Sequence, residues 1–479
     1  MCGIVGYIGR RDAYPILIKG LRRLEYRGYD SAGVAMINTS HELNVYKSKG
    51  KVDNLCDYCT DKDVSGTVGI AHTRWATHGP ACERNAHPHL HGKLALVHNG
   101  IIENYKPLRE RLINEGYQFS SDTDSEVLLC LIHSYHETGI TLEQALRKAL
   151  SEVEGSYAIA LMAADDPGHL YGARHGSPLV IGLGIGENFL ASDVLALLPV
   201  THRFIYLEED EFTMVSRSEV KIFTLDGTPV RREAATSTLD AESISRGSYR
   251  HFMQKEIFEQ PAALRDTLLG RVSGGSVNAS ALTGLSAGEL EKIEQVKLVA
   301  CGTSYHAALV GRYWLEELTG LPASAEIASE YRYRKAVVRP GTLFVTISQS
   351  GETADTLASL RLAKTQGYAQ TLCICNVNGS SLVRESGGAL LTRAGVEIGV
   401  ASTKAFTTQL ECLLLLALAL GQKRLGAARL NELIGDLKGL PELITEALAQ
   451  NDEIAAAAAE LCAREHTLYL GRGVMYPIA

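Results

Sequence analysis

The sequence opens with Met1-Cys2-Gly3-Ile4-Val5-Gly6, and this stretch decides how the first half of the chain is interpreted. Removal of the initiator methionine would leave a thiol and a free α-amino group on one residue, Cys2. A free α-amine has a pKa of about 8, so near neutral pH it can accept the proton of the thiol. The apolar residues 3–6 are typical of a buried strand that would hold Cys2 in place. The alternative is that Cys2 is a small residue that follows methionine by chance.

The bulk composition narrows the class of protein. At 479 residues the chain is too long for one hydrophobic core, so we expect two or three domains. A hydrophobic content of 46% with 21% charged residues is typical of a globular protein, and the net charge of −8 argues against a nucleic-acid partner. The longest apolar run, residues 413–420, is too short for a membrane span and predicts a buried helix. Ten cysteines without a signal peptide indicate reduced thiols and a cytoplasmic protein.

Residues 1–230 alternate strands with a few helices. The pattern predicts a helix over residues 15–25 and a strand over residues 94–98 that ends at Asn99-Gly100, a dipeptide typical of a hairpin turn. A further helix is predicted over residues 127–135. The acids Asp122 and Asp124 precede it, and capping of this helix is the simplest explanation for them.

Four groups from separate segments, two from side chains with opposite charge and two hydrogen-bond donors, could together serve the attack of a thiolate on an amino-acid carboxamide. Attack of a thiolate on a carboxamide creates an oxyanion, which the Asn99 amide and the Gly100 N–H could stabilise. An amino-acid substrate also carries a carboxylate and an ammonium group. Arg74 could bind the carboxylate through two parallel hydrogen bonds, and Asp124 could pair with the ammonium.

Several motifs occur in the order found in the glutaminase domain of N-terminal-nucleophile (Ntn) amidotransferases, which the first half therefore resembles. They are Cys2-Gly-Ile-Val-Gly, Arg27-Gly-Tyr-Asp-Ser-Ala-Gly33, His72-Thr-Arg-Trp-Ala-Thr-His78-Gly, His98-Asn-Gly-Ile-Ile-Glu-Asn104 and Asp122-Thr-Asp124-Ser-Glu. The resemblance implies a four-layer α/β/β/α sandwich for residues 1–230.

The same resemblance implies roles for five residues of a glutamine pocket. Arg74 would hold the α-carboxylate of glutamine and Asp124 its α-amine, while Thr77 and His78 would line the pocket. Trp75 resembles the residue that gates the ammonia passage in this family. For Trp75 the alternative of a core tryptophan stays open.

The pattern of predicted elements changes in the second half of the chain, where strands alternate with helices. After a polar linker at residues 231–248 and a helical connector at residues 249–269, the sequence predicts strands over residues 296–300, 342–347 and 396–400. Each is followed by a loop of hydroxyl and glycine residues and then by a helix, which indicates a parallel sheet with helices on both faces. The glycine-rich turns in the chain lack this strand–helix context, so we assign no nucleotide site to them.

Loops of this kind lie at the carboxyl ends of parallel strands, where open α/β sheets bind ligands. The N–H groups of a helix N-terminus, together with hydroxyls, hold phosphate without a metal. Two such loops, at Ser304 and at residues 348–353, favour a phosphate site. The alternative is that these hydroxyls only cap their helices.

Cys301-Gly-Thr-Ser304, Ser348-Gln-Ser-Gly-Glu-Thr353 and Ala401-Ser-Thr-Lys404 resemble a sugar isomerase (SIS) domain. Joined to the glutaminase motifs, the whole chain resembles the family of isomerising glutamine–fructose-6-phosphate aminotransferases. In that family the positions that match Thr303, Ser304, Ser348, Gln349, Ser350 and Thr353 hold the sugar phosphate, and those that match Val400 and Ser402 line the sugar site.

The resemblance also implies the reaction. Glutamine would be hydrolysed through a thioester on Cys2, with Asn99 and Gly100 as the oxyanion hole. Ammonia would pass internally to fructose 6-phosphate, giving glucosamine 6-phosphate and glutamate. The resemblance implies no metal, organic cofactor, nucleic acid or membrane. It does imply a homodimer that forms through the SIS part. The rivals are another Ntn amidotransferase, acting on a phosphoribosyl or aspartyl acceptor, and a non-catalytic SIS sugar-phosphate sensor.

The expected domains are an Ntn glutaminase at residues 1–230, the linker at 231–248, the connector with a first SIS domain at 249–460 and the start of a second SIS domain at 461–479. The stretch 467–473 is predicted to be the first strand and turn of this second, truncated lobe. The family's isomerising base would lie beyond it, and His306 and Glu397 have surface or capping explanations. We therefore expect this chain to hydrolyse glutamine and to bind a sugar phosphate weakly, without forming glucosamine 6-phosphate.

Overall fold

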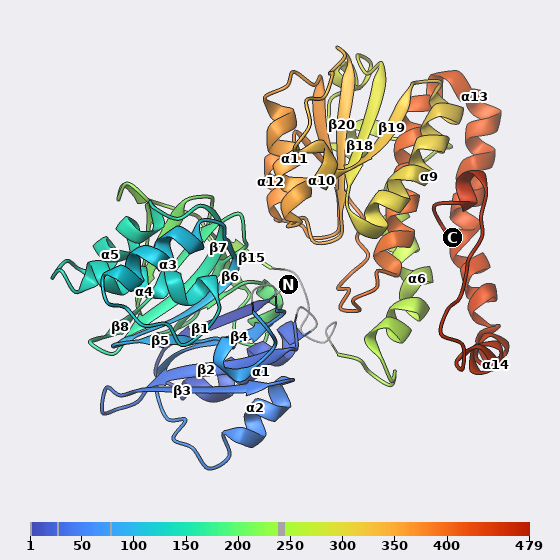
Figure 1. Cartoon of the computed structure of the whole chain (residues 1–479). Helices are drawn as coiled ribbons and strands as arrows, with labels where there is room; N and C mark the ends of the chain where they lie inside the picture. Colours follow the sequence, from blue (N-terminus) through green and yellow to red (C-terminus); the bar gives the residue numbers. More distant parts are fainter. Residues whose placement is uncertain (1, 26–27, 77–78, 238–244) are drawn as a thin grey trace. The chain divides into compact units, whose positions relative to one another are not determined.

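The computed structural model describes residues 2–25, 28–76, 79–237 and 245–479. The chain divides into two compact units, Met1–Ser245 and Arg246–Ala479, and each unit has its own sheets (Figure 1). Each unit also has its own hydrophobic core. This division falls inside the predicted linker, of which residues 238–244 lie outside the described residues.

Two antiparallel sheets form the centre of the first unit. The eight-stranded sheet contains, in spatial order, β15 (Ala235–Thr236), β11 (Arg203–Tyr206), β9 (Val180–Leu183), β10 (Asn188–Ala191), β1 (Gly3–Ile8), β4 (Val68–Arg74), β2 (Ser31–Ile37) and β3 (Leu43–Lys49). The seven-stranded sheet contains β14 (Pro229–Val230), β13 (Val220–Thr224), β12 (Glu211–Val215), β8 (Asp166–His175), β7 (Gly155–Ala163), β6 (Leu94–Ile102) and β5 (His89–His91).

Helices cover the outer face of each sheet. The first sheet is covered by α1 (Ala13–Leu24) and α2 (Val52–Tyr58), and the second by α3 (Tyr105–Asn114), α4 (Asp124–His136) and α5 (Leu142–Leu150) (Figure 1). Side chains such as Ile4, Ile70 and Val97 form a core between the two sheets. A second core, which includes Leu128 and Leu161, lies between the seven-stranded sheet and its helices. This layering is the α/β/β/α sandwich that the sequence motifs implied.

Strand β1 lies in the middle of its sheet and is buried along its whole length. It pairs with β4 in an antiparallel register that sets Gly3 opposite Thr73. The register therefore brings Cys2, which precedes β1, to the end of β4 that carries Arg74. A Cβ atom on Gly3 would lie only 2.7 Å from Leu24 Cβ and from Thr73 Oγ1, so the strand needs glycine directly after Cys2.

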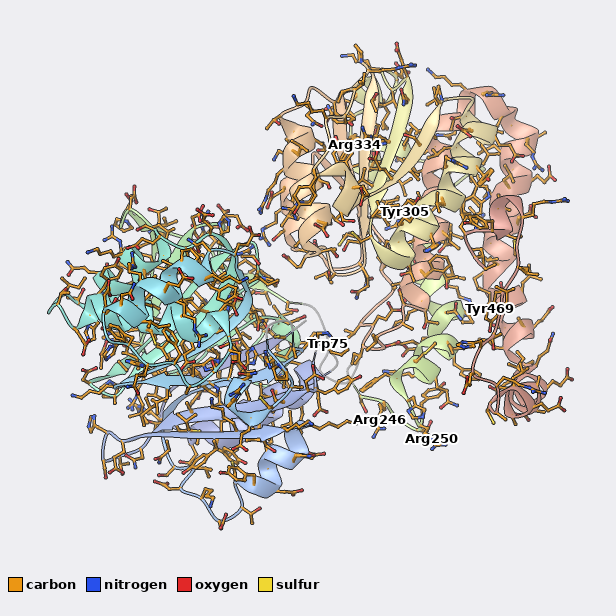
Figure 2. The ribbon with its side chains drawn as sticks, in the orientation of Figure 1. Trp75, Arg246, Arg250, Tyr305, Arg334 and Tyr469 are labelled. Carbon is orange, nitrogen blue, oxygen red and sulfur yellow. The ribbon has the colours of Figure 1, made fainter. Side chains whose placement is uncertain are left out.

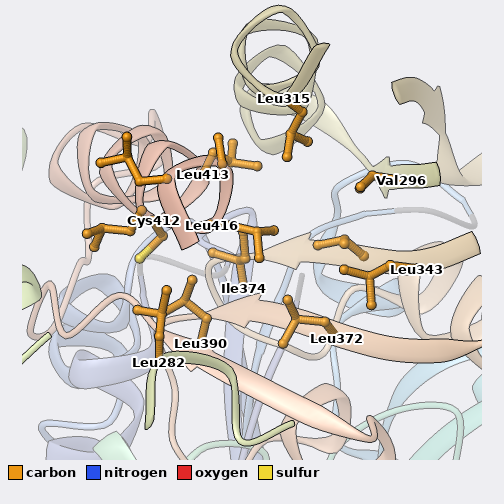
Figure 3. Packing of buried hydrophobic residues seen from close by; sticks show 14 of the residues in the cluster. Leu282, Val296, Leu315, Leu343, Leu372, Ile374, Leu390, Cys412, Leu413 and Leu416 are labelled. Atoms are coloured by element: carbon orange, nitrogen blue, oxygen red, sulfur yellow. The ribbon is translucent and has the colours of Figure 1, made fainter. Parts of the chain in front are cut away.

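The second unit is built on a five-stranded parallel sheet. Its order is β19 (Ala323–Ile327), β18 (Gln295–Ala300), β20 (Thr342–Ser348), β21 (Gln370–Cys375) and β22 (Gly388–Leu391). One face packs against α9 (Gly302–Thr319) and α13 (Lys404–Leu448), with Leu343 and Leu416 among the core residues (Figure 3). The other face, which includes Phe344, packs against α10 (Ala328–Tyr331), α11 (Ala354–Lys364) and α12 (Ser381–Glu385).

Shorter elements complete this unit. They are α6 (Phe252–Leu268), which packs on α13, the hairpin β16 (Val272–Ser273) and β17 (Ser276–Val277), and the helices α7 (Ala279–Thr283), α8 (Ala287–Leu290) and α14 (Asn451–Leu461). Helix α13 is long and apolar enough to cross a membrane, but 61% of its most apolar window is buried. Because Leu413 and Leu416 lie in the core, the buried helix predicted for residues 413–420 is confirmed (Figure 3).

Two predicted strands of the second half are wrong. Residues 396–400 form no strand, because the carboxylate of Glu256 on α6 accepts hydrogen bonds from the N–H groups of Ile398, at 2.5 Å, and Gly399, at 2.9 Å, in place of a neighbouring strand. Residues 467–473 also form no strand, and Leu468 and Tyr469 are largely exposed (Figure 2). No described strand pairs with this segment, so its apolar pattern alone does not make a sheet.

Candidate functional site

The thiol of Cys2 lies at the end of β4 in the first unit. Its sulfur accepts a hydrogen bond from the Trp75 backbone N–H at 3.3 Å, and its S–H faces the Trp75 carbonyl at 3.6 Å. Burial raises the pKa of the Cys2 thiol, while the Trp75 N–H and the positive charge of Arg74 lower it. Because burial is the largest of these effects, forming a thiolate here requires a base close to the sulfur.

The side chain of Asn99 reaches the same place from the other sheet. Its Nδ2 donates a hydrogen bond to the Cys2 carbonyl at 3.2 Å. Asn99 and Gly100 do not form the predicted hairpin turn, because both lie inside β6 and pair with β7 opposite Ala158 and Tyr157. Gly100 has a φ of 129°, and a Cβ there would lie 2.0 Å from the Ser156 carbonyl oxygen. Glycine is thus required by close strand approach, not by a turn.

Arg74 and Asp124 are both buried beside this position. Burial lowers the pKa of the Arg74 guanidinium, and the charges of Cys2 and Asp124 act in the opposite direction. One nitrogen of Arg74, Nη1, donates to the Pro80 carbonyl at 3.3 Å. Asp124 accepts a hydrogen bond from the Ile102 N–H at 2.8 Å, which fixes its carboxylate at the end of β6. The structure therefore brings a cationic and an anionic side chain together near Cys2.

The capping explanation for the two aspartates is wrong. The N-cap of α4 is Thr123, whose hydroxyl accepts from the Glu126 N–H at 3.3 Å. Asp124 is the first residue of the helix itself, and Asp122 instead forms an ion pair with Arg84 at 2.6 Å. Neither carboxylate caps the helix, so helix capping does not explain the presence of an aspartate at position 124 beside Cys2.

Trp75 is not a core tryptophan, since 44% of its surface is exposed (Figure 2). Its ring meets that of Tyr29 edge-on, with centroids 5.7 Å apart. Asp30 anchors the backbone on either side of it by accepting from the Ala76 N–H at 2.8 Å and donating its own N–H to the Arg74 carbonyl at 3.0 Å. Thr77 and His78, predicted to line the glutamine pocket, lie outside the described residues.

The loops predicted to bind phosphate meet at one edge of the parallel sheet. Strands β18 and β20 are neighbours, with Ala300 opposite Ile347, so the loops after them start side by side. The helix that follows β18, α9, lies on one face of the sheet, whereas α11, which follows β20, lies on the other. The chain order thus reverses between these two strands, and this is the topological switch point at which open α/β sheets bind ligands.

Within these loops the hydroxyls are not used as helix caps. The N-cap positions of α9 and α11 are Cys301 and Thr353, and neither makes a side-chain capping hydrogen bond. Ser348 instead accepts from the Gly351 N–H at 3.0 Å and lies 3.2 Å from the Thr353 hydroxyl oxygen. The alternative that these hydroxyls only cap the helices α9 and α11 is therefore wrong.

The remaining predicted residues of the sugar site differ in exposure. Thr303 and Ser304 lie in the first turn of α9, and Gln349 and Ser350 lie in the loop before α11. Val400 is 81% exposed. The Ser402 hydroxyl donates to Glu397 at 2.9 Å, and the same carboxylate accepts from the N–H groups of Thr403 and Ala405.

Three residues that position the site were missed from the sequence. Asp30 fixes the backbone around Trp75, Glu256 holds the loop before Ser402, and His72 contacts Asn99. A signal existed for His72, since it precedes Arg74 by two residues on a strand and so points to the same side of the sheet. Within the described ranges, no group of three or more His, Cys, Asp or Glu residues is arranged to hold a metal ion.

Comparison with known proteins finds a matching domain family in each half of the chain. A glutamine amidotransferase domain matches residues 72–199, and a SIS domain matches residues 289–419. The glutamine–fructose-6-phosphate aminotransferases (isomerizing) of Photorhabdus laumondii and Haemophilus influenzae are each 53% identical over 100% of this chain and 79% of their own length. The chain belongs to this family.

A solved structure of a relative is also similar. The C-terminal domain of glucosamine-fructose-6-phosphate aminotransferase from Francisella tularensis is 47% identical and matches 49% of this chain and 66% of that one, with a TM-score of 0.48. As a member of the isomerizing aminotransferase family, the chain carries one of its two matched domains in each compact unit.

Proposed function

We propose that the chain is a glutamine-dependent aminotransferase that converts fructose 6-phosphate to glucosamine 6-phosphate and releases glutamate. The observation that carries the proposal is the meeting of the Cys2 thiol, the Trp75 N–H and the Asn99 amide at the end of β4. The membership of the isomerizing aminotransferase family supports it, as do the loops at the switch point of the parallel sheet.

In the first half-reaction, the Cys2 α-amine, made available by removal of Met1, takes the thiol proton. The thiolate attacks the side-chain carbonyl carbon of glutamine, and the resulting oxyanion is stabilised by the Asn99 Nδ2–H and the Gly100 N–H. The intermediate collapses by expelling ammonia, which receives the proton from the α-amine. Water then hydrolyses the thioester that remains on Cys2 and releases glutamate.

The recognition of glutamine uses the charged residues around the thiol. Arg74 holds the α-carboxylate and Asp124 the α-ammonium, with Thr77 and His78 as further pocket residues and Trp75 as the gate for ammonia. Because Arg74 and Asp124 are buried, their interactions with a substrate are only weakly screened by water.

In the second unit, the loops with Thr303, Ser304, Ser348, Gln349, Ser350 and Thr353 bind the phosphate of the sugar. The N-termini of α9 and α11 supply N–H groups and favourable dipoles there. Val400 and Ser402 line the sugar. We further propose that the protein acts in the cytoplasm as a homodimer formed through its SIS part, with the glutaminase at residues 1–230 and the connector with a first SIS domain at residues 249–460.

The decisive experiment compares the chain with its Cys2→Ala variant. Loss of the nucleophile should lower glutamate release from glutamine by at least about 10⁴-fold while circular dichroism stays unchanged. Cys462→Ala, which removes an exposed thiol in the other unit, is the matched control and should keep full activity. Retained glutaminase activity in Cys2→Ala would contradict the proposal.

Glutamate and glucosamine 6-phosphate should be assayed separately, with fructose 6-phosphate, a phosphoribosyl acceptor and aspartate together with ATP each offered as the ammonia acceptor. Amination of fructose 6-phosphate alone supports the proposal and would contradict the expectation from the sequence that this chain forms no glucosamine 6-phosphate. Glutamate release without amination of any acceptor would limit the activity to the glutaminase half-reaction. Amination of another acceptor would instead favour a different Ntn amidotransferase, and sugar-phosphate binding without glutamate release would favour a sensor.

A further inference from the structure

The strongest unassigned feature of the molecule is a set of buried histidines behind Asn99. The rings of His72 and His87 stack with centroids 4.2 Å apart and planes inclined by 19°, and His89 packs edge-on to His87 at 4.6 Å. All three are buried, and burial lowers the pKa of each well below that of an ordinary histidine. Among them, His72 also contacts the candidate oxyanion hole.

The hydrogen bonds of His72 fix its tautomer. Its Nε2 lies 3.1 Å from the His98 backbone oxygen and 3.0 Å from Asn99 Oδ1. A backbone carbonyl can only accept a hydrogen bond, so Nε2 must carry the proton. The other ring nitrogen, Nδ1, is buried and has no hydrogen-bond partner among the described residues, so a second proton there would be unsatisfied.

The tautomer in turn fixes the orientation of the Asn99 amide. The atom of Asn99 that faces the Nε2–H must be the oxygen, because an amide NH₂ group would set two donors against each other. The NH₂ group is then turned toward Cys2, where it donates to the Cys2 carbonyl at 3.2 Å. One of its two hydrogens makes this bond, which leaves the second for an oxyanion.

The ring of His72 is itself held in place. It is stacked against His87, whose Nδ1 accepts a hydrogen bond from the His98 N–H at 3.2 Å. Close approach of this stack to β2 depends on Gly33, since a Cβ there would lie 2.1 Å from the His87 carbonyl oxygen. The direction of the His72 Nε2–H therefore has little freedom.

We infer that His72 is a positioning residue for glutamine hydrolysis: its Nε2–H holds the Asn99 amide with the NH₂ group toward the oxyanion. The inference rests on the proposed function of Cys2 and Asn99. Misorientation of the Asn99 amide would place its oxygen against the developing negative charge. His72 therefore contributes to stabilisation of the transition state and not to the binding of glutamine.

The test is a double-mutant cycle on glutamate release. His72→Phe keeps a flat ring without the donor and should lower kcat about ten- to a hundred-fold with little change in KM, because one oriented donor of the hole is lost. His72→Gln, which restores an N–H donor, should recover most of the rate. In an Asn99→Ala background, His72→Phe should have no further effect, because the side chain on which His72 acts is gone.

His89→Phe is the matched control, since His89 is buried in the same set but bonds to the Thr123 hydroxyl at 2.9 Å. Any effect of His89→Phe on kcat should multiply with that of Asn99→Ala. If the effect of His72→Phe also multiplies with Asn99→Ala, His72 is merely structural and the inference is wrong.

Two further measurements test the role of His72 without relying on the rate of the His72→Phe variant alone. Glutamate γ-semialdehyde forms a thiohemiacetal whose oxygen occupies the oxyanion hole, so its inhibition should weaken in His72→Phe in parallel with kcat, while inhibition by glutamate should not. In the wild-type protein, long-range ¹H–¹⁵N spectra at pH 7 should show a neutral His72 ring protonated at Nε2. Protonation at Nδ1 would overturn the inference, whereas absence of Cys2-dependent glutaminase activity in the wild type would overturn the proposed function itself.

Discussion

The two candidate sites obtain their polar groups in opposite ways. Around Cys2, buried side chains from both sheets meet, and hydrogen bonds such as that from His72 to Asn99 fix their orientation before any substrate arrives. At the switch point of the parallel sheet, the groups are hydroxyls and helix N-termini at a loop edge, without side-chain caps. Covalent chemistry needs fixed, desolvated groups, whereas phosphate binding needs unsatisfied N–H groups near the surface.

The comparison predicts that substitutions near Cys2 act through lost geometry. Arg74→Lys should raise the KM for glutamine about ten- to a hundred-fold, because lysine cannot form two parallel hydrogen bonds and one charge-assisted bond contributes about 1.5–3 kcal/mol. Steady-state glutaminase kinetics measure this directly. Arg22→Lys, at an exposed ion pair with Asp53, is the control and should leave KM unchanged. An unchanged KM in Arg74→Lys would show that Arg74 does not bind the carboxylate.

In the second unit, the backbone of the loop should matter more than any single side chain. Gly351 has a φ of 69°, and a Cβ there would lie 2.0 Å from Ser380 Oγ. Gly351→Ala should therefore distort the loop and weaken binding of fructose 6-phosphate about tenfold, since the strained backbone alone costs about 1–2 kcal/mol. Calorimetric titration tests this.

The matched control is Gly367→Ala, at a similar φ of 81° but with open space around its Cβ and outside the phosphate loops. It should bind the sugar phosphate normally, and both variants should keep full glutaminase activity. Equal loss of binding in the two variants would indicate general destabilisation of the unit, and would contradict a specific role for the loop after β20.

The sites were predictable to different degrees. The strand–loop–helix pattern around Ser304 and Ser348 predicted the parallel sheet of the second unit. The α/β/β/α sandwich of the first unit followed only from the family resemblance that the order of motifs carries. The Asn99–Gly100 hairpin was wrong because the same dipeptide also serves where two strands approach closely. The strand at residues 396–400 was wrong because Glu256, more than a hundred residues away, satisfies its backbone. Such long-range side-chain contacts leave no local signal.

Buried histidines should also make the first unit sensitive to acid. Burial lowers the pKa of His72 to about 3 and that of His87 and His89 well below its usual value, so these rings stay neutral in the folded state. In the unfolded chain they bind protons below a pH of about 6.5. Their folded-state pKa is depressed, and therefore stability is full above pH 6.5 and falls as the pH drops below it.

Between pH 7 and 5.5 we expect a loss of roughly 1 kcal/mol in the free energy of unfolding for each of the three histidines. Urea unfolding followed by the fluorescence of Trp75, in a Trp314→Phe background, reports on the first unit. In the His72→Gln variant the loss should be smaller by one such increment. A free energy of unfolding that is the same at both pH values would contradict the neutral, buried state of these rings.

Every step proposed for glutamine hydrolysis depends on Cys2 as the nucleophile of the first unit. The most direct test treats the protein with a chloroketone analogue of glutamine and locates the label by mass spectrometry of peptides. We expect a single covalent label on Cys2 as the N-terminal residue. Excess glutamine should prevent this labelling, and the exposed Cys462 should stay unlabelled under the same conditions. Labelling of another cysteine with loss of activity, or full activity in protein that retains Met1, would contradict this role of Cys2.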